Sequence, residues 1–158
     1  MFKLHEKLVQ STTPLGQFKL SLVLLHNDAN YPWVVLVPKR TNIREIHHLS
    51  EVDQIQLIRE SSHLSEVMSD IFAPETMNIA ALGNLVPQLH IHHVARFESD
   101  ACWPKAVWGT TEFVPYAASE QAARSTRLID SLVGEGFEAF DVNHVDTPDP
   151  ESSAGFTP

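Results

Sequence analysis

The chain has 158 residues, of which 43% are hydrophobic and 20% are charged, with a formal net charge of −9. These values are typical of one globular domain, and the acidic excess argues against binding to nucleic-acid backbones, which requires clustered Lys and Arg. No apolar run reaches the ~18 residues of a membrane span, no hydrophobic signal segment follows Met1, and a single cysteine excludes an internal disulfide, so we expect a cytoplasmic protein that binds no membrane.

The N-terminal half carries the patterns of two helices and a hairpin. Apolar residues at helical spacing predict a short helix over residues 3–10, and the Pro and Gly of "TPLGQF" then predict a turn. The β-rich runs over 18–28 and 32–40 flank the turn-forming "NDANYP" and predict an antiparallel hairpin. Ser50 as an N-cap, followed by apolar residues at helical spacing, predicts a long helix over 50–71.

The second half begins with two further strand patterns, "MNIAALG" and "VPQLHIHHVARF", on either side of a Gly83-Asn84 turn. Residues 117–135 suit a final helix that is ended by Gly134. The order of elements predicts an α+β fold with a largely antiparallel sheet. Its organisation is a domain over 1–116, followed by the C-terminal helix.

Residues 136–158 are acidic, rich in Pro, Ser and Gly, and without hydrophobic periodicity. This composition predicts a flexible tail. Three apolar side chains in it can instead dock on the domain or on a partner, namely Phe137, Phe140 and Val142.

Three of the nine histidines lie within four positions: His90, His92 and His93. Alternate residues of a strand share a face, so Gln88, His90 and His92 form one polar row. His93 belongs to the opposite, mostly apolar row, where we expect it to make a local hydrogen bond or to lie at the edge of the core.

The row of Gln88, His90 and His92 is compatible with three interpretations. His-x-His is a common two-ligand unit for Zn, Fe or Cu, which would need a third ligand. Neutral imidazole is also a nucleophile near pH 7, and it requires a partner that fixes its tautomer. A pair of exposed histidines without chemistry is the third interpretation.

The stretch "GNLVPQLHIHHVAR" resembles the signature of the histidine triad family of nucleotide hydrolases and transferases, in which three histidines alternate with apolar residues after a Gly-polar-x-Val turn. The upstream hairpin and long helix are also similar, and "ACWPKAVWG" resembles a bacterial branch with Gln at the first motif position. The resemblance covers residues 1–116 and departs from the motif at Gln88 and His93. It implies a five-stranded, mostly antiparallel sheet and a homodimer whose two sheets join.

The same resemblance implies roles for individual residues. His90 matches the histidine that attacks the α-phosphorus and forms a covalent nucleotidyl intermediate. His92 matches a phosphate and leaving-group contact, and Gln88 matches the residue that places the scissile phosphate. Three further residues match substrate contacts: Asn84 for phosphate oxygens, and Asn27 and Asp28 for the ribose hydroxyls.

Arg96 continues the polar row and is a candidate for offsetting substrate charge, as are Lys39, Arg40 and Lys105. Covalent catalysis by imidazole requires no metal, so we expect no cofactor in the protein, and a divalent cation can accompany the nucleotide. We therefore expect a nucleotide phosphoanhydride hydrolase or nucleotidyl transferase, similar to diadenosine polyphosphate hydrolases, with a small-molecule nucleotide as its partner. The alternatives are a non-catalytic nucleotide-binding module and a metal-dependent protein that uses the histidine cluster.

Overall fold

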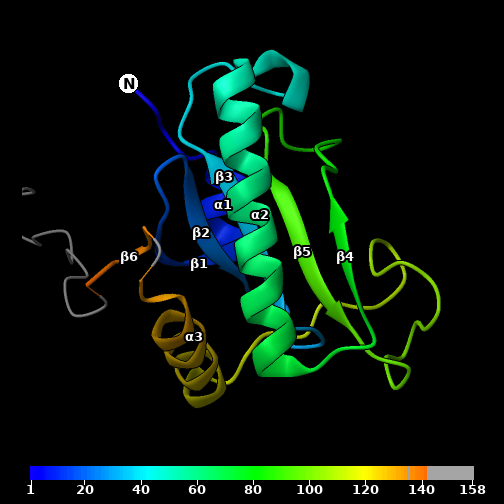
Figure 1. Cartoon of the computed structure of the whole chain (residues 1–158). Helices are drawn as coiled ribbons and strands as arrows, with labels where there is room; N and C mark the ends of the chain where they lie inside the picture. The colour runs from blue at the N-terminus through cyan, green and yellow to red at the C-terminus, as the bar shows by residue number, and fades with distance from the viewer. Residues whose placement is uncertain (135, 142–158) are drawn as a thin grey trace, which may run out of the picture.

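The centre of the fold is an antiparallel sheet of six strands in the order β4-β5-β3-β2-β1-β6 (Figure 1). The structure is a computed structural model, which describes residues 1–134 and 136–141. The strands are β1 (Thr12–Gln17), β2 (Ser21–His26), β3 (Trp33–Pro38), β4 (Thr76–Ala80), β5 (Ile91–Arg96) and β6 (Glu138–Ala139). The α+β class is confirmed, whereas the expected count of five strands is one too low.

Helices connect and cover the sheet. They are α1 (Glu6–Ser11), the 3-10 turn η1 (Ile46–His48), α2 (Glu51–Phe72) and α3 (Ala118–Leu132). The start of α2 is capped as the sequence predicts, because the Ser50 hydroxyl accepts a hydrogen bond of 3.2 Å from the Asp53 backbone N–H. Among the helices of the described chain, none has the length and apolar character needed to cross a membrane.

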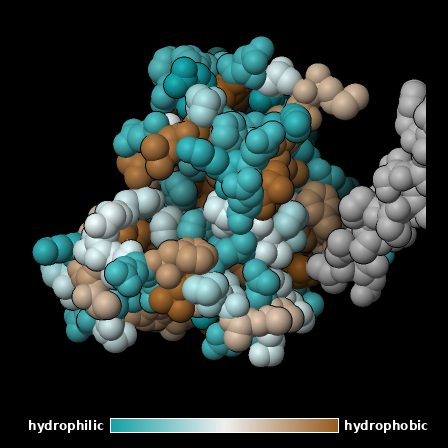
Figure 2. Space-filling model, turned by 180° about the vertical axis from the view of Figure 1, so that it is seen from behind, coloured by the Kyte–Doolittle hydropathy of each residue, from teal (hydrophilic) through white to brown (hydrophobic). Residues whose placement is uncertain are grey.

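The two faces of the sheet bury separate apolar clusters. Helices α2 and α3 lie on one face of the sheet (Figure 1). On this face Leu64 and Leu128 pack with buried residues of the strands. On the opposite face, Leu8 of α1 and Val107 of the long segment after β5 cover a second cluster. Figure 2 shows the molecule from behind, where polar and apolar side chains are mixed over the surface. All residues of β3 and β5 are buried because both of their faces are covered.

Two strands are absent from the sequence-based assignment. Residues 12–17 contain Pro and Gly, which predict a turn, yet they form β1 with an irregularity in register between Pro14 and Gly16. A side chain at Gly16 would collide with the Phe137 ring and the Glu138 carbonyl, so glycine is what lets β6 approach β1.

The first residues of the predicted tail belong to the fold. Phe137 is buried, with its ring 5.5 Å from that of Phe18 between centroids, and residues 138–139 pair with β1. The ordered domain therefore continues past the predicted boundary at residue 136. Val142 and the rest of the tail lie outside the described residues.

Candidate functional site

The two histidines of the polar row lie at the start of β5, next to the central strand β3. His92 is paired with Val35 of β3, and His90 immediately precedes β5. Their rings lie 4.9 Å apart between centroids in an edge-to-face arrangement. Only 5% of His90 and 8% of His92 is exposed, so the structure contradicts the interpretation of an exposed, idle pair.

The tautomer of His90 is set by the main chain. Its Nδ1 lies 2.7 Å from the carbonyl oxygen of Gln88, and a carbonyl can only accept, so Nδ1 carries the proton. The lone pair is then on Nε2, which is the nitrogen that can attack an electrophile. The backbone at Gly83 passes close to this ring, since a Cβ there would lie 3.8 Å from His90 Cε1.

His92 has the opposite tautomer. The indole Nε1–H of Trp33 donates a hydrogen bond of 3.0 Å to His92 Nδ1, and an indole N–H can only donate. In the neutral ring the proton is therefore on Nε2. Burial, together with the neighbouring His90, lowers the pKa of His92 to about 3. At neutral pH His92 is thus an uncharged hydrogen-bond donor.

Three aromatic side chains that the sequence motif does not include surround His92. The ring of His26, at the end of β2, stacks on Trp33 at 4.1 Å between centroids with an interplanar angle of 17°. Burial lowers the pKa of His26, although the nearby Asp28 opposes the shift. Trp108 lies edge-to-face with His92 at 5.6 Å. These residues come from separate segments, and no local spacing identifies them as parts of one site.

Gln88 does not direct its amide at the histidine pair. Its Oε1 accepts a hydrogen bond of 2.9 Å from the His5 backbone N–H, and its Nε2 donates one of 2.9 Å to the Lys3 carbonyl. The side chain therefore holds the N-terminal segment, while its own carbonyl orients His90. A hollow of about 440 Å³ opens beside it, lined by residues 1–6, 41–43 and 87–88.

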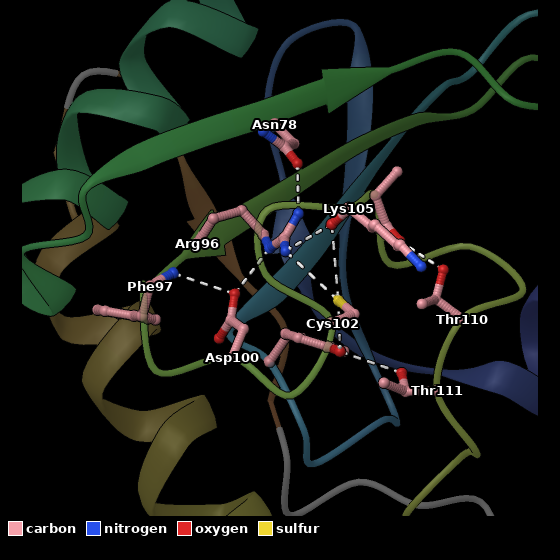
Figure 3. A network of polar contacts seen from close by, with 10 residues as sticks. Asn78, Arg96, Phe97, Asp100, Cys102, Lys105, Thr110 and Thr111 are labelled. Atoms are coloured by element: carbon pink, nitrogen blue, oxygen red, sulfur yellow. Dashed lines mark hydrogen bonds and ion pairs between the residues drawn. The ribbon is translucent and has the colours of Figure 1, made fainter.

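Arg96 is buried and fully engaged within the protein. Only 1% of it is exposed, and its guanidinium group binds Asp100 at 2.7 Å, the Asn78 side chain at 2.7 Å and the Lys105 carbonyl at 2.9 Å (Figure 3). The Asp100 carboxylate thereby balances the positive charge of Arg96, and the N–H groups of the guanidinium are occupied by acceptors within the protein. This geometry gives Arg96 a structural role rather than the expected contact with substrate charge.

The remaining candidates are Asp28, Asn27 and Asn84, which differ in burial and in the hydrogen bonds of their side chains. Asp28 is 6% exposed, and its Oδ1 accepts from the backbone and the amide of Asn30, which closes a turn. Asn27 Oδ1 accepts from Thr13 Oγ1 at 2.8 Å, and the Asn27 side chain stays half-buried. Asn84 is exposed and follows Gly83 directly. We keep Asn27 and Asn84 as candidates for substrate contact and assign Asp28 to the turn.

The histidine on the reverse face has a structural environment. His93 is fully buried, its Nδ1 donates to the Ile91 carbonyl at 3.2 Å, and its Nε2 accepts from the Ser61 hydroxyl at 2.7 Å. This contact joins α2 to β5. Within residues 1–134 and 136–141, no three His, Cys, Asp or Glu side chains are grouped so that they could hold a metal ion.

We compared the chain with protein-family models, curated proteins and solved structures. A family model described as the HIT domain matches residues 7–99, whereas a search of curated proteins gives no match. Three solved structures of histidine triad proteins superpose with TM-scores of 0.81. They come from Marinobacter aquaeolei (48% identity, 84% of this chain and 96% of that chain), Bradyrhizobium japonicum (44%, 82% and 97%) and Sinorhizobium meliloti (36%, 84% and 98%). With the motif histidines at the start of β5 and the family match over most of the domain, this chain belongs to the histidine triad family, which includes nucleotide hydrolases and transferases.

Proposed function

We propose that this protein is a nucleotide phosphoanhydride hydrolase or nucleotidyl transferase that works through a covalent intermediate on His90. The observation that carries the proposal is the pair of complementary tautomers, with a free lone pair on His90 Nε2 and a proton on His92 Nε2. The first is a nucleophile and the second is a donor to a phosphate oxygen. Both are held in place by hydrogen bonds before any substrate arrives, which is how positioning lowers the barrier in phosphoryl chemistry.

In the first step, His90 Nε2 forms a bond to the α-phosphorus as the bond from phosphorus to the bridging oxygen breaks. That oxygen leaves with the electron pair, as part of a phosphate, pyrophosphate or nucleotide. In the second step, water or an acceptor hydroxyl attacks phosphorus and loses its proton to solvent. The P–N bond breaks, and its electron pair returns to Nε2.

The neutral state of His92 favours substrates whose leaving group needs no proton. A polyphosphate departs as a stable anion, whereas an amine has to be protonated before it leaves. Neither the amide of Gln88 nor an imidazole with a pKa of about 3 supplies that proton near pH 7. Phosphoanhydrides are therefore the proposed class, and a divalent cation accompanies the nucleotide rather than residing in the protein.

A homodimer is part of the proposal. Strand β4 lies at the edge of the sheet, and Ile79 in it is 50% exposed, next to Leu82 at 39% and Leu85 at 79%. An open edge with exposed apolar residues is suited to pairing with the same edge of a second copy. Sedimentation at micromolar concentration tests this arrangement, and Ile79→Lys should yield monomers.

The central experiment is a panel of adenosine polyphosphates, phosphoramidates and adenylylated conjugates, assayed for release of nucleoside monophosphate. We expect turnover of the polyphosphates, and acid-free quenching during turnover should trap a nucleotidyl adduct on the peptide that contains His90. A non-catalytic nucleotide-binding module would bind these compounds with neither release nor adduct. A metal-dependent enzyme would lose activity on exhaustive chelation and recover it with a transition metal but not with Mg²⁺.

A further inference from the structure

Trp108 lies beside His92, one of the two proposed catalytic histidines, and its indole N–H has no acceptor in the part of the chain that the structure describes. Its ring lies 5.6 Å from that of His92 and 5.7 Å from that of Trp33 between centroids, edge-to-face with both. Its indole Nε1 is buried and has no hydrogen-bond partner among the described residues. Buried indole N–H groups ordinarily have an acceptor, so this one is exceptional.

The segment that carries Trp108 is held firmly in place. Asp100 receives a hydrogen bond from the Arg96 side chain and one of 3.0 Å from the Phe97 backbone N–H, while Arg96 also binds the Lys105 carbonyl (Figure 3). Farther along, the Tyr31 hydroxyl lies 3.0 Å from Thr111 Oγ1. Because these contacts flank Trp108 on both sides, its unpaired donor is not explained by a loosely packed segment.

We propose that Trp108 is a substrate-contacting residue whose indole N–H donates a hydrogen bond to a non-bridging oxygen of the phosphate attacked by His90. The proposal rests on the proposed function. A phosphate group presents several acceptor oxygens and no donor, and its equatorial oxygens share the negative charge of the phosphoryl group in the transition state. His92 Nε2–H and Trp108 Nε1–H are both neutral donors in the same aromatic cluster, and together they match such an acceptor. Neither adds a charge that would have to be desolvated.

The kinetic test compares Trp108→Phe, which keeps an aromatic ring and removes the N–H, with Trp103→Phe as a control in the same segment. The Arg96 guanidinium lies over the Trp103 ring, 5.8 Å from its centroid. With an adenosine polyphosphate, W108F should lose at least about tenfold in kcat/KM, since removing one oxyanion donor costs about 10² to 10³ in well-studied hydrolases. W103F should stay within about threefold of wild type. Equal kcat/KM in W108F and wild type would overturn the proposal.

A binding measurement separates the hydrogen bond from simple packing. Calorimetric titration with adenosine monophosphate and with adenosine gives the affinity gained from the phosphate. This gain should shrink at least fivefold in W108F and remain in W103F. If W108F loses affinity for both ligands equally, the indole only packs against the nucleoside and the proposal is wrong.

A measurement on the wild-type chain covers the case in which W108F does not fold. The three tryptophans give three indole N–H resonances, which W103F and W33F assign. The Trp108 resonance should move downfield with adenosine monophosphate but not with adenosine. A Trp108 signal that responds equally to both contradicts the proposal. If wild type binds the monophosphate with this shift but turns over no nucleotide, the proposed function fails while the phosphate contact stands.

Discussion

Trp33 and His92 lie 59 residues apart in sequence, and they are joined by a hydrogen bond of 3.0 Å from the indole N–H to the imidazole Nδ1. The pairing of β3 with β5 creates this contact, since Trp33 is opposite Val94, two residues beyond His92. The bond selects the His92 tautomer with a proton on Nε2. The bond therefore determines whether His92 Nε2 presents an N–H donor or a lone pair to a phosphate.

Replacing Trp33 by Phe should remove the preference of His92 for this tautomer, while the Phe ring can still stack on His26. The loss of one hydrogen bond of about 1 kcal/mol corresponds to roughly a fivefold change in tautomer population, and we expect kcat to fall by at least that factor. Nitrogen-15 NMR of the imidazoles reports the tautomer directly. An unchanged His92 spectrum in W33F would show that the indole does not select it.

His90→Ala should reduce turnover of an adenosine polyphosphate by at least about a thousandfold, because removal of a nucleophile abolishes the covalent route. Affinity for the product nucleotide should change much less. His48→Ala is the matched control, because His48 is exposed on η1 and distant in sequence from the motif. Comparable turnover in H90A and wild type would exclude the covalent mechanism.

If the proposed function holds, the protein should turn over phosphoanhydrides in preference to phosphoramidates, measured as the ratio of kcat/KM for an adenosine polyphosphate and an adenosine phosphoramidate. Gln88→His should leave this ratio nearly unchanged, because position 88 faces the backbone of residues 3 and 5. The substitution should instead lower the melting temperature by loosening the N-terminal segment. If this ratio of kcat/KM values fell strongly in Q88H, the side chain at position 88 would have to lie close to the leaving group.

Acid should destabilise the fold through His93. Burial lowers its pKa from 6.5 to about 4, so the unfolded chain binds this proton at a higher pH than the folded one. Stability is therefore unaffected by His93 above about pH 6.5, falls as the pH drops toward 4, and levels off below it. His93→Gln can keep the contact with Ser61 without titrating. Urea unfolding at pH 7 and pH 4.5 should show a smaller acid loss in H93Q, and identical losses would assign the effect to other groups.

Phe137→Ala should destabilise the domain by about 3 kcal/mol, as expected when a buried aromatic side chain is deleted. Phe137 fills the space above Gly16 and packs on Phe18. Glu138→Ala removes only an exposed hydrogen bond with Gln17 and should change stability little. Thermal melts of F137A, E138A and wild type compare their melting temperatures. A melting temperature for F137A equal to wild type would mean that residues 137–139 do not support the core.

Local patterns in the sequence were enough for the long helix and for the central hairpin, because helical periodicity and β-rich runs are read within a few residues. The helix predicted over 50–71 is α2 (Glu51–Phe72), with Ser50 as its cap. Strand β1 was missed because Pro14 and Gly16 are turn signals locally. They are tolerated there by an irregular register and by the approach of β6.

The motif also identified the two histidines and, through resemblance, the histidine triad family. Their protonation and their neighbours could be decided only by tertiary structure. The hydrogen-bond partner of His92 is Trp33 of β3. The amide of Gln88 forms its hydrogen bonds with the backbone of residues 3 and 5 and not with the histidines. Arg96 shares a face with His92 by strand alternation, yet its contacts with Asp100 remove it from the site. Hydrogen bonds between distant segments carry no local signal, because strand pairing and the packing of the segment after β5 create them only once the chain has folded.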